Sequence, residues 1–166
     1  MMKVLAGTRA PADNEQERQA RLRQVEQMLA KGMSGIAEAS LPRLLAPRML
    51  AEKLAVVARL REMILRTDPQ GAAAVQRGMA ARRDYSDDLS GTNVPTLVIV
   101  GRDDSIRPVA DAEFMHDRIR DSRLEIVEDA AHMTNMEQPE AFNKILIGFL
   151  GNTSKHGGKP AFHCQH

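Results

Sequence analysis

Residues 94–108 read VPTLVIVGRDDSIRP, a continuous apolar run followed by an abrupt polar turn. The run from Thr96 to Val100 is rich in β-branched residues and lacks polar alternation, which is typical of a strand buried on both faces of a parallel sheet. Gly101 and the polar residues after it end the strand in a turn. The stretch therefore predicts a buried strand with acidic side chains just beyond its C-terminal end.

A second strand and two helices are predicted downstream. The pattern favours a helix from Val109 to about Arg120, a shorter strand in RLEIVED (residues 123–129), and a closing helix over residues 139–150. Such alternation specifies parallel strands joined by right-handed crossovers, so the C-terminal ends of the strands point to the same edge of the sheet. Ligand chemistry usually lies at that edge.

The N-terminal part has a different period. KVLAG (residues 3–7) indicates a short buried strand, and apolar residues then recur with helical spacing from Asn14 to about Met79. Start and stop signals divide this helical region. Helix starts are predicted at Asp13 or Asn14, each with Gln16 or Glu17 three residues on, and at Asp68 before Pro69. A helix stop is predicted at Gly32, and helix breaks are predicted at Pro42 and Pro47. One short strand and an all-helical block are therefore expected before residue 88.

An aspartate and a histidine follow the two predicted downstream strands. Asp104 comes after the strand 96–100, and His132 comes after the strand 124–127, so their loops should be neighbours. A carboxylate that accepts from imidazole Nδ1 fixes the tautomer and lets Nε2 take a proton from a serine or cysteine. On spacing alone, the alternative is that His132 caps a turn and Asp104 is an ordinary Asx-turn residue.

Composition limits the class of protein. The chain has 166 residues, 43% of them hydrophobic, which is enough for one core, and its net charge of +1 gives no case for nucleic acid or an anionic membrane. No apolar stretch approaches the length of a membrane span or a signal peptide. The single cysteine, Cys164, excludes an intrachain disulfide. We expect a soluble, cytoplasmic protein.

Residues 93–150 resemble the C-terminal part of the α/β-hydrolase family. The shared motifs are a G-x-x-D-x-x-x-P turn and a histidine followed by an E-x-P helix: Gly101, Asp104, Pro108, His132, Glu137 and Pro139. The resemblance implies that Asp104 and His132 are the acid and base of a Ser-His-Asp triad, with Asp103 excluded because the acid stands three residues after the glycine. Two departures are Ala131, where glycine is usual, and Arg107, where a small or hydroxyl residue is common.

The resemblance extends to the N-terminal part. LAGTRAPADNEQERQAR (residues 5–21) resembles the sixth sheet strand leading into a helical cap, as in esterase-like and enol-lactone-hydrolase-like members. The implied fold is the C-terminal half of an α/β-hydrolase: about three parallel strands with flanking helices and an inserted helical cap. Its expected division is residues 1–12 for the first strand and linker, 13–88 for the cap, 89–150 for the C-terminal α/β core, and 151–166 for a disordered tail.

The nucleophile of this family is missing from the sequence. The family serine lies in a G-x-S-x-G elbow after a strand, and the nearest match, KGMSGI (residues 31–36), lacks the second glycine and follows a predicted helix. Ser34 is therefore interpreted as a helix N-cap. The oxyanion donors, which accompany the nucleophile, are missing as well. The chain is expected to be half an enzyme whose serine lies upstream of Met1.

Two functions remain open. In the first, the chain, when complemented, hydrolyses a small ester or lactone, with Met33, Met133 and Met136 lining an apolar pocket under the cap. Its partner would be an N-terminal half, or a second copy, bound at the unpaired edge of the first strand. In the second, the chain is a catalytically silent module, or truncated pseudoenzyme, that binds another chain.

Neither function requires a cofactor or a metal ion. The C-terminal tail contains His163, Cys164 and His166 close together, but no second pair of ligands accompanies them. We expect no zinc site and no cofactor.

Overall fold

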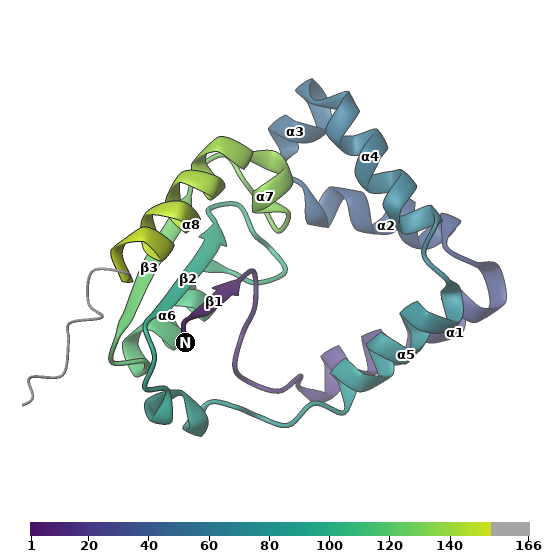
Figure 1. Cartoon of the computed structure of the whole chain (residues 1–166). Coiled ribbons are helices and arrows are strands. Elements are labelled where there is room, and N and C mark those ends of the chain that lie inside the picture. The colour runs from purple at the N-terminus through teal and green to yellow at the C-terminus, as the bar shows by residue number, and fades with distance from the viewer. Residues whose placement is uncertain (154–166) are drawn as a thin grey trace, which may run out of the picture.

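A computed structural model describes residues 1–153 and contains a three-stranded parallel sheet. The strands β1 (Lys3–Ala6), β2 (Thr96–Gly101) and β3 (Ser122–Val127) lie in the order β1-β2-β3, with α6 (Val109–Arg118) and α8 (Pro139–Thr153) on opposite faces (Figure 1). Both pairings are parallel, so all three strands end at one edge. The predicted architecture of about three parallel strands with flanking helices is confirmed.

The central strand β2 is buried along its whole length, as its unbroken apolar sequence predicts. Its side chains alternate between two clusters. The cluster beneath α8 contains Leu97, Ile99, Val127, Ala130 and Phe149. The cluster beneath α6 contains Ala10, Leu89, Val98, Val100, Ala112, Met115 and Ile119. Two helices thus fix the strand from opposite sides and hold the loop after Gly101 in place.

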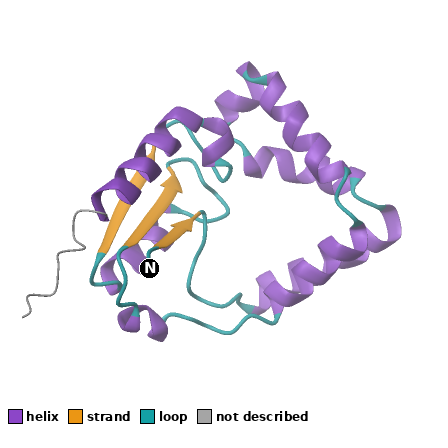
Figure 2. Cartoon of the chain, in the orientation of Figure 1, coloured by secondary structure: helices purple, strands orange, loops and turns teal. Residues whose placement is uncertain are grey.

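A helical arm is inserted between β1 and β2 and extends away from the sheet (Figure 2). It consists of α1 (Glu15–Lys31), α2 (Ser34–Leu44), α3 (Pro47–Glu52), α4 (Leu54–Leu65) and α5 (Pro69–Ala80), and the short 3₁₀ helix η1 (Asp87–Gly91) leads back to β2. Helix α1 packs along α5, and α2 packs along α4. We call α1–α5 the cap, and the exact division at residues 13 and 88 remains a prediction.

Most helix boundaries in the cap follow the predicted signals. Asn14 and Glu17 form a reciprocal capping box at the start of α1, and Gly32 ends α1 with a φ of 71°. The Asp68 carboxylate accepts from the backbone N–H groups of two residues in the first turn of α5. Local capping chemistry therefore determines where these helices begin and end.

Three expectations for helix ends were wrong or incomplete. Ser34 is the exposed first residue of α2, and the N-cap is the buried Met33, which makes no side-chain capping bond. Pro42 lies inside α2 near its C-terminal end, where it removes a single N–H donor, and so it does not interrupt the helix. The short helix α7 (Thr134–Glu137), which follows His132, was not predicted.

The last helix, α8, continues to Thr153, beyond its predicted end at residue 150. The remaining predicted tail, including His163, Cys164 and His166, lies outside the described residues. Within residues 1–153, every helix is too short or too polar to cross a membrane.

The backbone of residues 130–131 passes so close to the last residue of β2, Gly101, that only glycine fits at this position. A Cβ atom at this position would lie 2.1 Å from the carbonyl oxygen of Ala131 and 2.4 Å from that of Ala130. Replacing Gly101 with alanine should therefore lower the free energy of unfolding by at least about 3 kcal/mol, measured by urea denaturation.

The matched control is Gly78→Ala. Gly78 lies inside α5, and a Cβ atom added there would meet open space, so alanine should stabilise the chain by about 0.5–1 kcal/mol through helix propensity. Equal stabilities for Gly101→Ala and the wild type would contradict the crossing.

Candidate active site

The loops that follow the three strands meet at one edge of the sheet. Gly7 follows β1, Asp104 follows β2 and His132 follows β3. Gly7 has a φ of 54°, and a Cβ there would lie 3.4 Å from both Nδ1 and Cε1 of His132. The end of β1 thus forms a close support for the imidazole ring, in a backbone conformation that favours glycine.

The Asp104 carboxylate binds the imidazole of His132. Asp104 Oδ2 lies 2.8 Å from His132 Nδ1, and its other oxygen accepts from the backbone N–H groups of Ile106 and Arg107, both at 2.8 Å. The Asp104 side chain is 0% exposed and that of His132 is 24% exposed. The predicted approach of the two residues is confirmed. With Nδ1 directed to a carboxylate, Nε2 is the ring nitrogen available for chemistry.

A second buried carboxylate, Glu137, holds the loop that carries His132. Its oxygens accept from the backbone N–H groups of Ala131 and Met133, on either side of the histidine, and of Ala46 in the cap. Burial raises the pKa of the Glu137 carboxyl, while these three hydrogen bonds oppose the rise. The E-x-P motif of the sequence thus contributes a structural anchor for the histidine loop.

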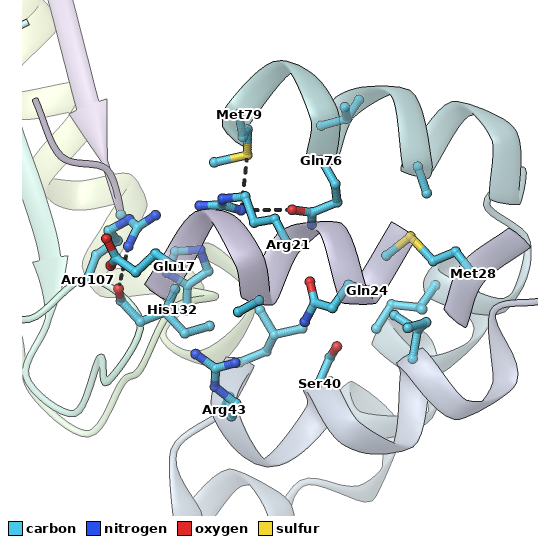
Figure 3. A pocket seen from close by; sticks show the side chains of 18 of the residues that line it. Glu17, Arg21, Gln24, Met28, Ser40, Arg43, Gln76, Met79, Arg107 and His132 are labelled. Carbon is cyan, nitrogen blue, oxygen red and sulfur yellow. Dashed lines mark hydrogen bonds between the residues drawn. The ribbon is translucent and has the colours of Figure 1, made fainter. Parts of the chain in front are cut away.

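A cavity of about 800 Å³ lies between the cap and the strand ends. His132 and Arg107 line its end nearest the sheet, and Met28 lines its far end (Figure 3). Met33 also lines the cavity, as predicted. Met133 and Met136 do not, because they pack against the apolar cluster of α2, α3 and α4. That part of the predicted pocket was wrong.

Arginines dominate the charged groups of the cavity lining. The described lining contains five of them and one carboxylate: Arg9, Arg21, Arg43, Arg82, Arg107 and Glu17. Arg9 binds Glu17 and the buried Asp13, and Arg21 also binds Asp13. The Arg21 guanidinium holds the pKa of the Asp13 carboxyl below its ordinary value, with Arg9 adding to the effect. The Arg9 guanidinium likewise lowers the pKa of Glu17.

Three of these arginines, Arg43, Arg82 and Arg107, lack a carboxylate partner, and Arg82 donates instead to the backbone carbonyls of Arg9, Ala10 and Pro11. Among residues 1–153, no Asp or Glu lies within salt-bridge distance of Arg43 or Arg107, and the Arg107 guanidinium donates to the backbone carbonyl of Ile106. Burial lowers the pKa of Arg107, and the positive charges of Arg9 and Arg21 lower it further, while the carboxylates of Asp111 and Asp13 oppose the change. The end of the cavity next to His132 therefore carries a guanidinium that is not in a direct ion pair. No cluster of metal-ligating side chains occurs within this part of the chain.

Comparison with known proteins gives the family. No family model matches the chain. It is 31% identical to 3-oxoadipate enol-lactonase 2 of Acinetobacter baylyi over 143 residues, which are 86% of this chain and 52% of the relative. A thermophilic esterase from Thermogutta terrifontis, solved with malate bound, matches 91% of this chain and 56% of its own at 35% identity and a TM-score of 0.88. The chain belongs to the α/β-hydrolase family and matches its C-terminal part.

A further solved structure supports this assignment. The enol-lactonase of Burkholderia xenovorans LB400 matches 90% of this chain and 56% of its own at 28% identity, with a TM-score of 0.80. The chain thus spans about half the length of the α/β-hydrolases that it matches.

Sequence reasoning brought Asp104 and His132 together and missed the charge of the cavity that His132 lines. The arginines come from the β1–α1 linker, α1, α2, the segment after α5 and the Asp104 loop, so no local motif unites them. The one available signal was Arg107, which departs from the family pattern. Its significance depends on the cap folding back over the strand ends.

Proposed function

We propose that this chain is the acid-and-base part of an α/β-hydrolase that cleaves a small ester or lactone by acyl transfer. His132 is the general base, Asp104 orients it, and a serine and the oxyanion donors come from a segment that is not in this chain. The observation that carries the proposal is the 2.8 Å contact between Asp104 Oδ2 and His132 Nδ1, made by a histidine that lines the cavity.

The proton transfers follow from this geometry. As the serine Oγ attacks the substrate carbonyl carbon, its proton moves to His132 Nε2, and the carbonyl oxygen becomes the oxyanion. The acyl C–O bond then breaks, and the leaving oxygen takes the proton from Nε2. Water then attacks the acyl-serine carbonyl carbon and gives a proton to Nε2; the bond between that carbon and the serine Oγ breaks, Oγ takes the proton from Nε2, and the carboxylic acid is released. Asp104 accepts the Nδ1–H bond throughout and stabilises the imidazolium.

The cavity favours a substrate that carries a carboxylate. Arg107 and Arg43 line it without carboxylate partners, so an anionic group there gains charge-assisted hydrogen bonds without displacing an existing ion pair. Met28, Met33 and Met79 supply a deformable apolar wall for the rest of the molecule. The activities named for the relatives, enol-lactonase and esterase, support a small lactone or ester as the reacting group.

The missing segment would bind at the free edge of β1. Among the described strands, β1 pairs only with β2, and Val4 is 40% exposed. An open edge with apolar side chains favours strand addition. A strand added there would also lie next to Gly7, which supports His132.

The function can be tested by supplying the missing half. We expect the chain alone to hydrolyse p-nitrophenyl acetate no faster than free imidazole, because a base without a nucleophile loses most of the acyl-transfer machinery. Fusing the unmatched N-terminal segment of the Thermogutta terrifontis esterase ahead of Met1 should create esterase activity with an acyl-enzyme burst.

Adjacent aspartates provide a matched pair of variants for that fusion. Asp104→Asn should lower kcat by about 10³–10⁴-fold, because the imidazole loses the acceptor that sets its tautomer. Asp103→Asn, which alters an exposed neighbour, should change kcat less than about twofold. A folded but inactive fusion would favour the silent interaction module, and full activity of Asp104→Asn would refute the assignment of the acid.

The open β1 edge predicts self-association of the isolated chain. Light scattering should show concentration-dependent oligomers, and Val4→Lys should reduce them because a charged side chain opposes strand addition at an edge. Val75→Lys, which introduces the same charge at an exposed position on α5, is the control and should leave association unchanged. A wild-type chain that stays monomeric at high concentration would argue against a free pairing edge.

The preference for an anionic substrate can be measured in the active fusion. Arg107→Gln should lower kcat/KM for the mono-p-nitrophenyl ester of succinic acid by about 10–100-fold relative to p-nitrophenyl acetate, because one charge-assisted hydrogen bond is lost. The exposed Arg23, which does not line the cavity, gives the control Arg23→Gln. Equal losses on both esters would contradict carboxylate recognition by Arg107.

A further inference from the structure

Glu137 connects two parts of the molecule that are far apart in the sequence. Its Oε2 accepts the backbone N–H of Ala46 at 2.7 Å, in the junction between α2 and α3 of the cap. Its Oε1 accepts the N–H groups of Ala131 at 2.9 Å and Met133 at 3.2 Å, the two neighbours of His132. One oxygen therefore serves the cap and the other serves the histidine loop.

The burial of this carboxylate makes the two connections depend on each other. Glu137 is only 5% exposed, and a buried carboxylate is stable only when its oxygens are hydrogen-bonded. Movement of Ala46 away from Oε2 would leave that oxygen without its hydrogen-bond donor from the cap. To keep this bond, Glu137 must move together with Ala46. Glu137 then shifts the backbone on both sides of His132, because it is hydrogen-bonded to that backbone.

We propose that Glu137 is a positioning residue that couples the cap to His132, so that the Asp104–His132 hydrogen bond responds to the position of the α2–α3 junction. A ligand in the cavity would contact α2 directly, since α2 and its N-cap contribute four lining residues: Met33, Ile36, Ser40 and Leu44. A ligand that shifts α2 thereby acts on the histidine through Ala46 and Glu137. This inference goes beyond the hydrolase proposal and needs only the observed Asp104–His132 contact.

A weaker parallel contact limits the damage when Glu137 is changed. The Met133 N–H also lies 3.2 Å from the carbonyl oxygen of Leu44, so the histidine loop keeps one direct hydrogen bond to the end of α2. Variants at Glu137 should therefore stay folded while losing the tighter coupling.

Two substitutions cut the connection from opposite sides. Glu137→Gln keeps one acceptor oxygen for Ala131 and Met133 and places an NH₂ group opposite the Ala46 N–H, which breaks the cap bond. Ala46→Pro removes the N–H itself. Proline suits the Ala46 φ of −61°, and the extended Leu45, with ψ of 144°, is compatible with a following proline.

The readout is solvent exchange of the His132 Nδ1 proton, measured by ¹H–¹⁵N NMR on the full chain. All variants carry Val4→Lys to oppose self-association, and Glu140→Gln, at an exposed residue of α8, is the control. We expect Glu137→Gln to accelerate exchange about tenfold and Glu140→Gln to leave it unchanged. Circular dichroism confirms that each variant is folded.

The double variant tests the coupling itself. If Ala46 acts on His132 through Glu137, then Ala46→Pro accelerates exchange in the wild-type background but adds nothing to Glu137→Gln. Additive effects of the two substitutions on the exchange rate would overturn the proposal, as would an unchanged exchange rate in a folded Glu137→Gln chain. If Ala46→Pro does not fold, the exchange rate of Glu137→Gln is the test. An inactive fusion protein would refute the hydrolase function without altering these exchange rates.

Discussion

The close crossing of the backbone at residues 130–131 over Gly101 is the constraint on which the rest of the site depends. It brings the loop after β3 directly onto the end of β2, so that His132 reaches the carboxylate of Asp104 in the neighbouring loop. The crossing in turn requires β2 and β3 to be parallel and in register, because only then do both strands end at one edge. Sheet order, the absent side chain at position 101 and the Asp–His contact are consequences of one packing arrangement.

The α/β part was predictable because its signals are local. The run 96–100 predicts a strand buried on both faces, and Asn14 with Glu17 predicts a helix start. The spacing of Gly101, Asp104 and Pro108 predicts the turn that carries Asp104. Each signal concerns residues within a few positions of one another. The approach of Asp104 and His132 then followed from topology, since consecutive parallel strands place their loops side by side.

The contents of the cavity could not be predicted in the same way. Met133 and Met136 were assigned to the pocket because methionine suits a flexible apolar pocket, yet they pack toward the apolar cluster of α2–α4. Conversely, Arg9, Arg43 and Arg107 face a common space only because the cap returns over the strand ends. Which face a residue presents to a cavity depends on tertiary placement of helices, and single-sequence periodicity does not contain that information. The role of Glu137 was hidden for the same reason, as its partner Ala46 lies 91 positions away.

The one-sided pairing of β1 affects how firmly the His132 imidazole is held in place. This strand has four residues and hydrogen bonds to β2 alone among the described strands, so it opens at a lower free-energy cost than a strand paired on both sides. Gly7, at its end, lies against the His132 ring, and each opening of β1 removes that support. Any neighbour that occupies the free edge would lengthen the time for which the imidazole is held. Pairing along the edge of β1 and ordering of the His132 ring are therefore linked through Gly7.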